Sequence, residues 1–163
     1  MENYDLCVLG GGPSGYAAAM RAVDFGKKVI LVERSRLGGA GVYNGALSSK
    51  TFWELSKEIA SMRHKLDGYG MKMPQIPFGN ILEEVDNAVY ERSAQLEEHL
   101  RQIVHRDGEN FRFVKGSGRL LTPNKIEMRG EFEPYVVRSD YTCLLYTSPS
   151  PRDATLSRMP SSA

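Results

Sequence analysis

The stretch YDLCVLGGGPSG, residues 4–15, decides the fold. Its apolar first part has the length and composition of a buried strand in a parallel sheet. Gly10, Gly12 and Gly15 then form the spacing G-x-G-x-x-G, and the alanine-rich segment 12–26 predicts a helix. A strand, a glycine-rich loop and a helix in this order are typical of domains that bind a dinucleotide.

Each glycine of the loop has a distinct physical role. Gly10 permits a tight turn, Gly12 lets a diphosphate approach the backbone, and Gly15 lets the helix pack closely on the strand. The first helical turn, which begins with Pro13 and Ser14, offers free N–H groups and a positive dipole end to phosphates. The same glycines would also fit a turn without a ligand, but the flanking strand and helix favour phosphate binding.

An acidic residue stands near the end of the second predicted strand. The segment KKVILVER, residues 27–34, reads as another buried strand, and Glu33 stands near its end with Arg34 beside it. A carboxylate at this place can accept hydrogen bonds from both ribose hydroxyls of an adenine dinucleotide and would repel a 2′-phosphate. We therefore count Glu33 and Arg34 as candidate cofactor-binding residues. The loop and the acid do not decide between NAD and FAD.

The remainder of the chain predicts helices and then strands. Apolar residues at helical spacing indicate two further helices, and Asn80 is the expected N-cap of the longer one. The complete pattern predicts an α/β fold, a truncated Rossmann-like domain with a three-layer parallel sheet and a β-meander. The expected elements are strands at 4–11 and 27–34, helices at 12–26, 49–65 and 80–108, a loop at 67–79, and short strands at 111–121, 125–133 and 135–140.

Length and composition limit the number of domains and the classes of partner. The 163 residues suit about one domain, with ordinary hydrophobic (41%) and charged (25%) content. A net charge of +1 gives no electrostatic argument for a nucleic-acid partner. No apolar run approaches the roughly 20 residues that a membrane helix needs. The first strand begins almost at Met1, which leaves no room for a targeting peptide, so we expect a cytoplasmic protein. The two cysteines form no metal-binding or disulfide pattern.

The stretch LGGAGVYNGALSSK, residues 37–50, resembles the flavoprotein pyridine nucleotide-disulfide oxidoreductase family, in its dihydrolipoamide dehydrogenase and soluble transhydrogenase branch. That family reads G-G-x-C-x-N-x-G-C-x-P-S-K at this place. Asn44 stands one position from the family asparagine, and Ser48 replaces the proline. The matching positions are Gly38, Gly39, Gly45, Ser49 and Lys50.

The resemblance implies that the dinucleotide is FAD. It also implies that Gly39 and Ala40 lie at the cofactor, and that a G-x-G segment, Gly116, Ser117 and Gly118, contacts the adenine. NAD(P)H would then be the substrate of a longer parent protein.

Gly41 and Ala46 stand where the family carries its two redox-active cysteines. Neither residue can form a disulfide, a thiolate or a mixed disulfide. Cys7 does not substitute for them, because a thiol inside a buried strand is expected to be structural. A lipoamide or glutathione reductase mechanism is therefore excluded for this site. Hydride transfer through the flavin is the chemistry that remains, and we assign no catalytic residue.

Two polar residues of the same stretch, Lys50 and Ser49, each have two possible roles. By the resemblance, the ammonium group of Lys50 lies near the flavin ring and favours the anionic reduced flavin, whereas a solvated surface lysine is the other interpretation. Ser49 serves either as a helix N-cap or as a phosphate contact.

The sequence therefore predicts the N-terminal FAD-binding part of an NAD(P)H-dependent flavoprotein oxidoreductase without the redox disulfide. By the resemblance, the parent is a homodimeric enzyme with a small-molecule electron acceptor, while the present chain alone is inactive because the nicotinamide and interface domains are missing. The alternative is a non-catalytic module that binds FAD or NAD. Another FAD family, such as an amine oxidase or hydroxylase, would share the glycine loop but not the Ser-Ser-Lys spacing.

The last residues, 143–163, show neither a strand nor a helix period. A disordered natural tail is one interpretation. We favour another, since CLLYTSPSPRD and SRMPSSA resemble one reading frame of a sequencing adapter and its adjoining primer. Residues 1–142 are then a partial FAD-binding domain, and residues 143–163 are a translated adapter that we expect to be disordered.

Overall fold

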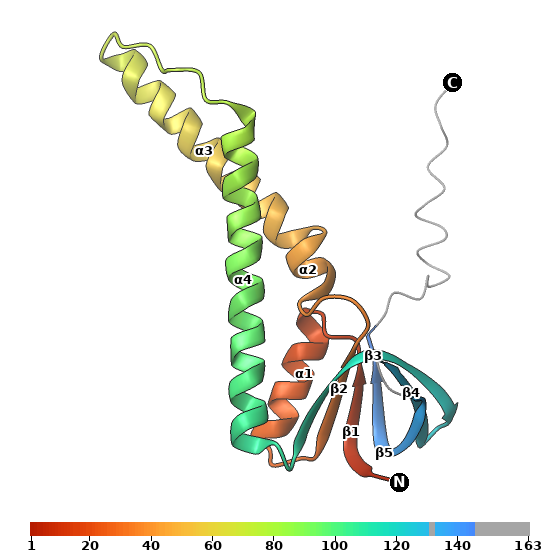
Figure 1. Cartoon of the computed structure of the whole chain (residues 1–163). Helices are drawn as coiled ribbons and strands as arrows, with labels where there is room; N and C mark the ends of the chain where they lie inside the picture. Colours follow the sequence, from red (N-terminus) through yellow and green to blue (C-terminus); the bar gives the residue numbers. More distant parts are fainter. Residues whose placement is uncertain (131–132, 146–163) are drawn as a thin grey trace, which may run out of the picture.

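The computed structural model describes residues 1–130 and 133–145. It begins with strand β1 (Asn3–Leu9), helix α1 (Pro13–Asp24) and strand β2 (Val29–Glu33). β1 and β2 are parallel, with Leu6 paired to Val29. The strand–helix–strand unit predicted from the glycine loop is therefore confirmed (Figure 1).

Three helices follow this unit, in a different arrangement from the expected one. α2 (Gly39–Tyr43) is a short helix that the sequence did not indicate, and α3 (Ala46–Gly68) begins earlier than expected. α4 (Phe78–Asp107) begins after Pro77, whose φ of −60° leads directly into the helix. The prediction of Asn80 as N-cap is wrong, because Asn80 lies inside the first turn and its N–H donates to the Pro77 carbonyl.

Strands β3 (Phe111–Thr122), β4 (Lys125–Gly130) and β5 (Tyr135–Leu144) complete the described sheet. β3 runs parallel to β2 in its first half and antiparallel to β4 in its second half. β5 pairs antiparallel with β4 and then parallel with β1. The sheet order β1-β2-β3-β4-β5 consequently closes on itself. The short strand expected at 135–140 is thus the first part of a longer strand that includes Cys143 and Leu144.

The closed sheet separates two apolar cores, because alternate side chains of a strand point to opposite faces. Val8 and Leu31 face the helices, whereas Cys7 and Ile30 face the meander of β3, β4 and β5. The buried residues of the helix-side core are Val8, Ala19, Val23, Val29, Leu31, Leu37, Val42, Leu96, Leu100, Ile103 and Phe111. Those of the meander-side core are Tyr4, Cys7, Leu9, Ile30, Val32, Ile126, Met128 and Val137.

These two cores define three layers. Helices α1 and α4 cover one face of the parallel strands, and the meander curls over the other face (Figure 1). The chain has the α/β, Rossmann-like architecture that the sequence predicted.

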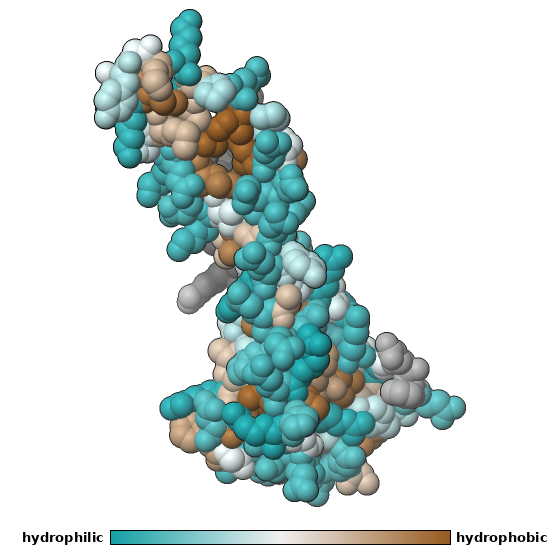
Figure 2. Space-filling view, turned by 60° about the vertical axis from the view of Figure 1, so that its left-hand side comes forward, coloured by the Kyte–Doolittle hydropathy of each residue, from teal (hydrophilic) through white to brown (hydrophobic). Residues whose placement is uncertain are grey.

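A helical arm, residues 52–82, extends away from the sheet (Figure 1). No residue of α3 is buried, and the rings of Phe52 and Phe78 stack at 6.4 Å between centroids. Figure 2 shows apolar side chains gathered near the far end of the arm. Its exposed large apolar residues are Trp53, Met62, Tyr69, Met71, Ile76, Phe78 and Leu82.

The seating of α1 on β1 generates a prediction about stability. A Cβ atom added at Gly15 would lie 1.8 Å from the carbonyl oxygen of Gly10, whereas one added at Gly12 would meet nothing within 4 Å. We expect Gly15→Ala to lower the free energy of unfolding by about 1–3 kcal/mol through overpacking. Gly12→Ala, the matched control, should lower it by less than about 1 kcal/mol. Urea denaturation of the ligand-free protein measures both, and equal losses would contradict the packing argument.

Candidate functional site

The glycine-rich loop joins β1 to α1 and exposes the first turn of the helix. Gly10 has a φ of +118°, a conformation that favours glycine, and its N–H donates to the Val32 carbonyl at 2.8 Å. Gly12 is the N-cap of α1, and Pro13 begins the helix. Since no side chain caps α1, the N–H groups of the following residues, Ser14 and Gly15, stay free for a ligand.

Glu33 fastens the end of β2 to this loop. One carboxylate oxygen accepts a hydrogen bond from the Gly11 N–H at 2.6 Å, and the other accepts one from the Ser35 N–H at 2.7 Å. Glu33 is half-buried. A carboxylate has more acceptor positions than these two bonds use, and it can still receive ribose hydroxyls.

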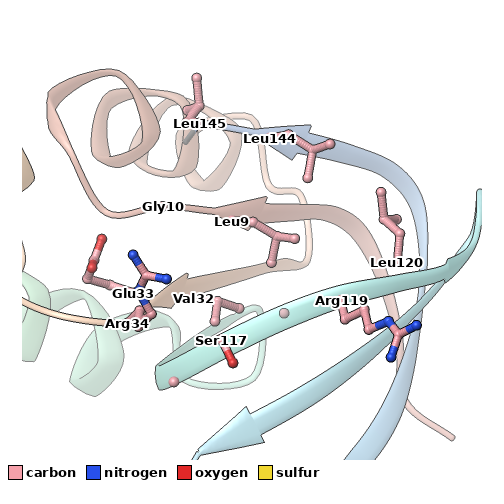
Figure 3. Close-up of a pocket in the computed structure, with 12 residues that line it drawn as sticks. Leu9, Gly10, Val32, Glu33, Arg34, Ser117, Arg119, Leu120, Leu144 and Leu145 are labelled. Atoms are coloured by element: carbon pink, nitrogen blue, oxygen red, sulfur yellow. The ribbon is translucent and has the colours of Figure 1, made fainter. Parts of the chain in front are cut away.

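A cavity of about 730 Å³ opens beside Glu33, at the carboxyl ends of β1 and β2 (Figure 3). The structure brings together here several residues that lie far apart in the sequence. The predicted site residues that line the cavity are Gly10, Glu33, Arg34, Gly116, Ser117 and Gly118.

The glycines of β3 allow a close approach to the neighbouring residues beside this cavity. A Cβ atom added at Gly118 would lie 2.4 Å from a methyl carbon of Leu9, and one added at Gly116 would lie 2.2 Å from the Arg129 carbonyl oxygen. Strand β3 therefore passes close to β1 and β4 at this point, with backbone and not side chains along part of the wall. An adenine ring can approach such a wall closely.

Sequence analysis missed the apolar part of the lining. Leu9 and Val32 carry only the pattern of buried strand residues, although both stand near strand ends, where ligands of parallel sheets bind. Leu144 and Leu145 belong to the segment 143–163, which has no strand period, and the alternation of β3 gives no signal for a cavity. The additional lining residues are Leu9, Val32, Arg119, Leu120, Leu144 and Leu145.

The second glycine cluster folds against the first. The Gly38 N–H donates to the Gly11 carbonyl at 2.8 Å, and a Cβ atom added at Gly39 would lie 3.2 Å from the Gly12 Cα. Gly38 and Gly39 both have positive φ values, 99° and 48°, which allow this tight return of the chain. Gly39 and Ala40 consequently open α2 beside the phosphate-binding candidate Gly12.

Gly41 lies in the middle of α2, and Ala46 is the first residue of α3. A Cβ atom added at Gly41 would lie 2.3 Å from the ring of Pro13, so α2 rests on the start of α1. Gly41 also lines a second cavity of about 390 Å³ together with Tyr16, whose hydroxyl is hydrogen-bonded to the Nδ1 atom of His99 at 2.5 Å. Burial raises the pKa of Tyr16, which keeps it a neutral phenol.

Sulfur is absent from both cavity linings. Both cysteines of the chain are free. Cys7 is fully buried between β1 and the meander, and burial raises the pKa of its thiol to about 12. Cys143 is partly buried against the helix-side core. The arrangement can bind a ligand, but it offers no thiolate for relaying electrons.

Lys50 and Ser49 do not line either cavity. Lys50 is exposed on the second turn of α3. The N-cap alternative for Ser49 is wrong, because α3 begins at Ala46 and the Ser49 hydroxyl donates to the Gly45 carbonyl. Its role as a phosphate contact stays a prediction.

Residues 1–130 and 133–145 contain no helix that is long and apolar enough to span a membrane. The same residues hold no group of three His, Cys, Asp or Glu side chains suited to a metal ion.

Comparison with known proteins agrees with the architecture of a dinucleotide-binding flavoprotein domain. The family described as FAD dependent oxidoreductase matches residues 5–110, and the chain belongs to this family. The chain is 34% identical over 137 residues to a dihydrolipoyl dehydrogenase of Vibrio parahaemolyticus, which covers 83% of this chain and 28% of that protein.

Two further relatives have the same partial overlap. A dihydrolipoyl dehydrogenase of Bacillus subtilis is 26% identical over 126 residues, which is 77% of this chain and 27% of the relative. A mercuric reductase of Lysinibacillus sphaericus is 27% identical over 130 residues, which is 79% of this chain and 23% of the relative. The chain thus spans about a quarter of the length of these relatives.

The depth of Cys7 generates a prediction about reactivity. Only the thiolate is nucleophilic, and a pKa of about 12 leaves about one molecule in ten thousand ionised at pH 8. We expect iodoacetamide at pH 8 to modify Cys143 while Cys7 stays unmodified in the folded protein. Peptide mass spectrometry locates the label, and the same reaction in guanidinium chloride should label both residues. Rapid labelling of Cys7 without unfolding would argue against its structural role.

Proposed function

We propose that this chain holds FAD, with the adenosine half in the 730 Å³ cavity and the diphosphate against the first turn of α1. The observation that carries the proposal is the open face of Gly12, where an added Cβ atom would meet nothing within 4 Å. The cavity lies where ligands of open parallel sheets bind, outside the carboxyl ends of the strands. The residues present therefore fit the cofactor of the family to which the chain belongs.

The proposed contacts follow from this placement. Glu33 accepts the ribose hydroxyls, and its bonds to Gly11 and Ser35 fix the carboxylate for that task. The free N–H groups after Gly12 and Pro13 donate to the diphosphate. The remaining proposed cofactor-binding residues are Gly10, Ser14, Gly15, Arg34, Gly39, Ala40, Lys50, Gly116, Ser117 and Gly118.

We further propose that the longer parent is an NAD(P)H-dependent oxidoreductase that works without a redox disulfide. Bound FAD supplies hydride acceptance and donation. Gly41 and Ala46 cannot form a disulfide, and the buried Cys7 lies in the meander-side core. These three positions support an electron acceptor other than a dithiol or disulfide.

Other features of the parent stay proposals that rest on the family resemblance. They include a homodimer, a small-molecule electron acceptor and a cytoplasmic location. We propose that the isolated chain has no turnover, because it spans about a quarter of its relatives' length.

For residues 143–163 we keep the proposal of a translated sequencing adapter. Cys143 and Leu144 continue strand β5, and the expectation of disorder for 146–163 lies outside the described residues. Nucleotide sequencing through the codon of Thr142 tests the proposal directly.

A non-catalytic module that binds FAD or NAD is the second candidate. The carboxylate of Glu33 fits FAD and NAD equally well, since both dinucleotides carry an adenosine ribose with two free hydroxyls. Titration of the purified chain with FAD and with NAD separates the two ligands, and a parent without a nicotinamide-binding segment would favour the module.

The ribose contact predicts a discrimination between ligands. We expect the wild-type chain to bind ADP about tenfold more tightly than 2′,3′-dideoxy-ADP, in line with the strength of hydrogen bonds to a charged acceptor. Glu33→Ala should reduce this ratio to near one. The ratio cancels any loosening of the loop, which would weaken both ligands alike. Isothermal titration calorimetry measures it, and a ratio that survives Glu33→Ala would contradict the contact.

The sulfur-free site predicts the activity of the full-length parent. The purified parent should be yellow and should reduce a dye or a quinone with NADH or NADPH, yet it should show no NAD⁺ reduction with dihydrolipoamide. Absorbance at the reduced-nicotinamide band follows both reactions, and a dihydrolipoyl dehydrogenase serves as the positive control. Robust dithiol turnover would refute the interpretation of Gly41 and Ala46.

A further inference from the structure

The junction between α2 and α3 contains an asparagine followed by a glycine, Asn44 and Gly45, and the pair occurs nowhere else in the chain. Asn44 is the C-cap of α2 and Gly45 is the N-cap of α3, so neither lies inside a helix. Asn44 is exposed. Within residues 1–130 and 133–145, its side chain has no hydrogen-bond partner and the Gly45 N–H donates to no carbonyl. The side-chain amide and the next main-chain nitrogen are therefore both available for reaction.

These two groups can close a five-membered ring. The Gly45 N–H gives its proton to hydroxide, the nitrogen bonds to the Cγ atom of Asn44, and the side-chain nitrogen leaves as ammonia with a proton from water. Water then opens the succinimide at either of its two carbonyl carbons, which gives aspartate or isoaspartate at position 44. A Cβ atom on the following residue would crowd the attacking nitrogen, and Gly45 has none.

The start of α3 favours the attack. No side chain caps this helix, so the N–H groups of its first turn lack a helical partner and its positive dipole end lies at the junction. Negative charge develops on the Gly45 nitrogen and then on the side-chain oxygen of Asn44. A helix N-terminus stabilises such charge.

The fold also leaves the junction free to move. Ring closure requires a rotation about the Cα–C bond of Asn44, whose ψ is 23°. Leu47 rests against the helix-side core, but no residue of α3 is buried, so the rotation disturbs little packed surface. Segments of this kind open locally at low cost in free energy.

We propose that Asn44 is a site of spontaneous modification in the folded chain, where it converts through a succinimide to isoaspartate and aspartate. Each product adds a negative charge at the end of α2, the short helix that begins with Gly39 of the second glycine cluster. Isoaspartate also adds one carbon to the main chain between α2 and α3, and so alters the link to the helical arm. The reaction needs only water and hydroxide, and it is independent of the proposed binding of FAD.

The test incubates the folded chain at pH 8 in water enriched in oxygen-18, with a parallel sample at pH 5. Ring opening places one oxygen-18 atom in the product, which separates this reaction from deamidation during later digestion. Peptide mass spectrometry locates the label, and an isoaspartyl methyltransferase measures isoaspartate. The matched variant is Asn44→Gln, which keeps a side-chain amide but would need a six-membered ring that closes far more slowly. The same chain unfolded in guanidinium chloride gives the rate without structure.

We expect Asn44 to lose its amide before the other asparagines, and at least as fast in the folded chain as in the unfolded chain. Isoaspartate should accumulate faster at pH 8 than at pH 5, because hydroxide takes the proton from the Gly45 N–H. Asn124 is the internal control, since its Nδ2 atom donates to the Ser139 carbonyl at 3.1 Å and a lysine follows it. Both Asn124 and the glutamine of Asn44→Gln should keep their amides.

A slower reaction in the folded chain than in the unfolded chain would overturn the inference, because the fold would then hold the two groups apart. Labelled aspartate without isoaspartate would contradict the cyclic route, since direct hydrolysis of the amide gives aspartate alone. Equal loss of the amide at Asn124 would also count against the proposal, because the junction would then have no special reactivity. None of these results bears on the proposed function, which titration of the freshly prepared chain with FAD tests separately.

Discussion

The close approach of α1 to β1 is the constraint on which the site depends. Only a glycine fits at position 15, because the Gly10 carbonyl oxygen occupies the place where a side chain would begin. This contact seats the helix with its N-terminus at the carboxyl ends of the strands. The loop is then fixed from two further sides, by the Glu33 carboxylate and by the Gly38 N–H, which both bond to Gly11. The turn is thus held in place by one side-chain carboxylate and by backbone groups of neighbouring segments.

The parallel strands separate two apolar cores, and their alternation keeps the Cys7 sulfur away from the site. Because residues alternate along β1, Cys7 points into the meander-side core while the loop lies beyond the end of the strand. A buried thiol of this kind behaves as a small apolar side chain. With glycine and alanine at positions 41 and 46, the chain retains the cofactor-binding architecture of its family without the groups that handle disulfides.

Local patterns predicted the parts of the structure that depend on neighbours in sequence. β1, the loop, α1 and β2 were predictable because strand composition, glycine spacing and helical composition agree within one short segment. The N-cap at Asn80 failed because the fixed φ of Pro77 starts α4 earlier. The double pairing of β3 and β5 could not be foreseen, since it depends on strands far apart in the chain.

The candidate site likewise contains residues that the sequence predicts and residues that it does not. Gly10 and Glu33 are predictable from motifs and residues 116–118 from the family resemblance, and the structure gathers them around one cavity. Leu120 gave no signal, because an apolar residue that borders a ligand looks the same in sequence as one that borders the core. Lys50 was placed by resemblance alone, and its exposed side chain lies outside both cavities.

The helical arm has a different energetic character from the sheet. No residue of α3 is buried, and apart from the packing of Leu47 near its start this helix is held by its own backbone bonds and by contacts with α2 and α4. Segments with little buried apolar surface open locally at a small fraction of the global unfolding free energy. Amide protons of α3 will consequently exchange with deuterium through local opening of the helical arm. Those of β1 and β2 will exchange much later, because their exchange requires the whole domain to unfold.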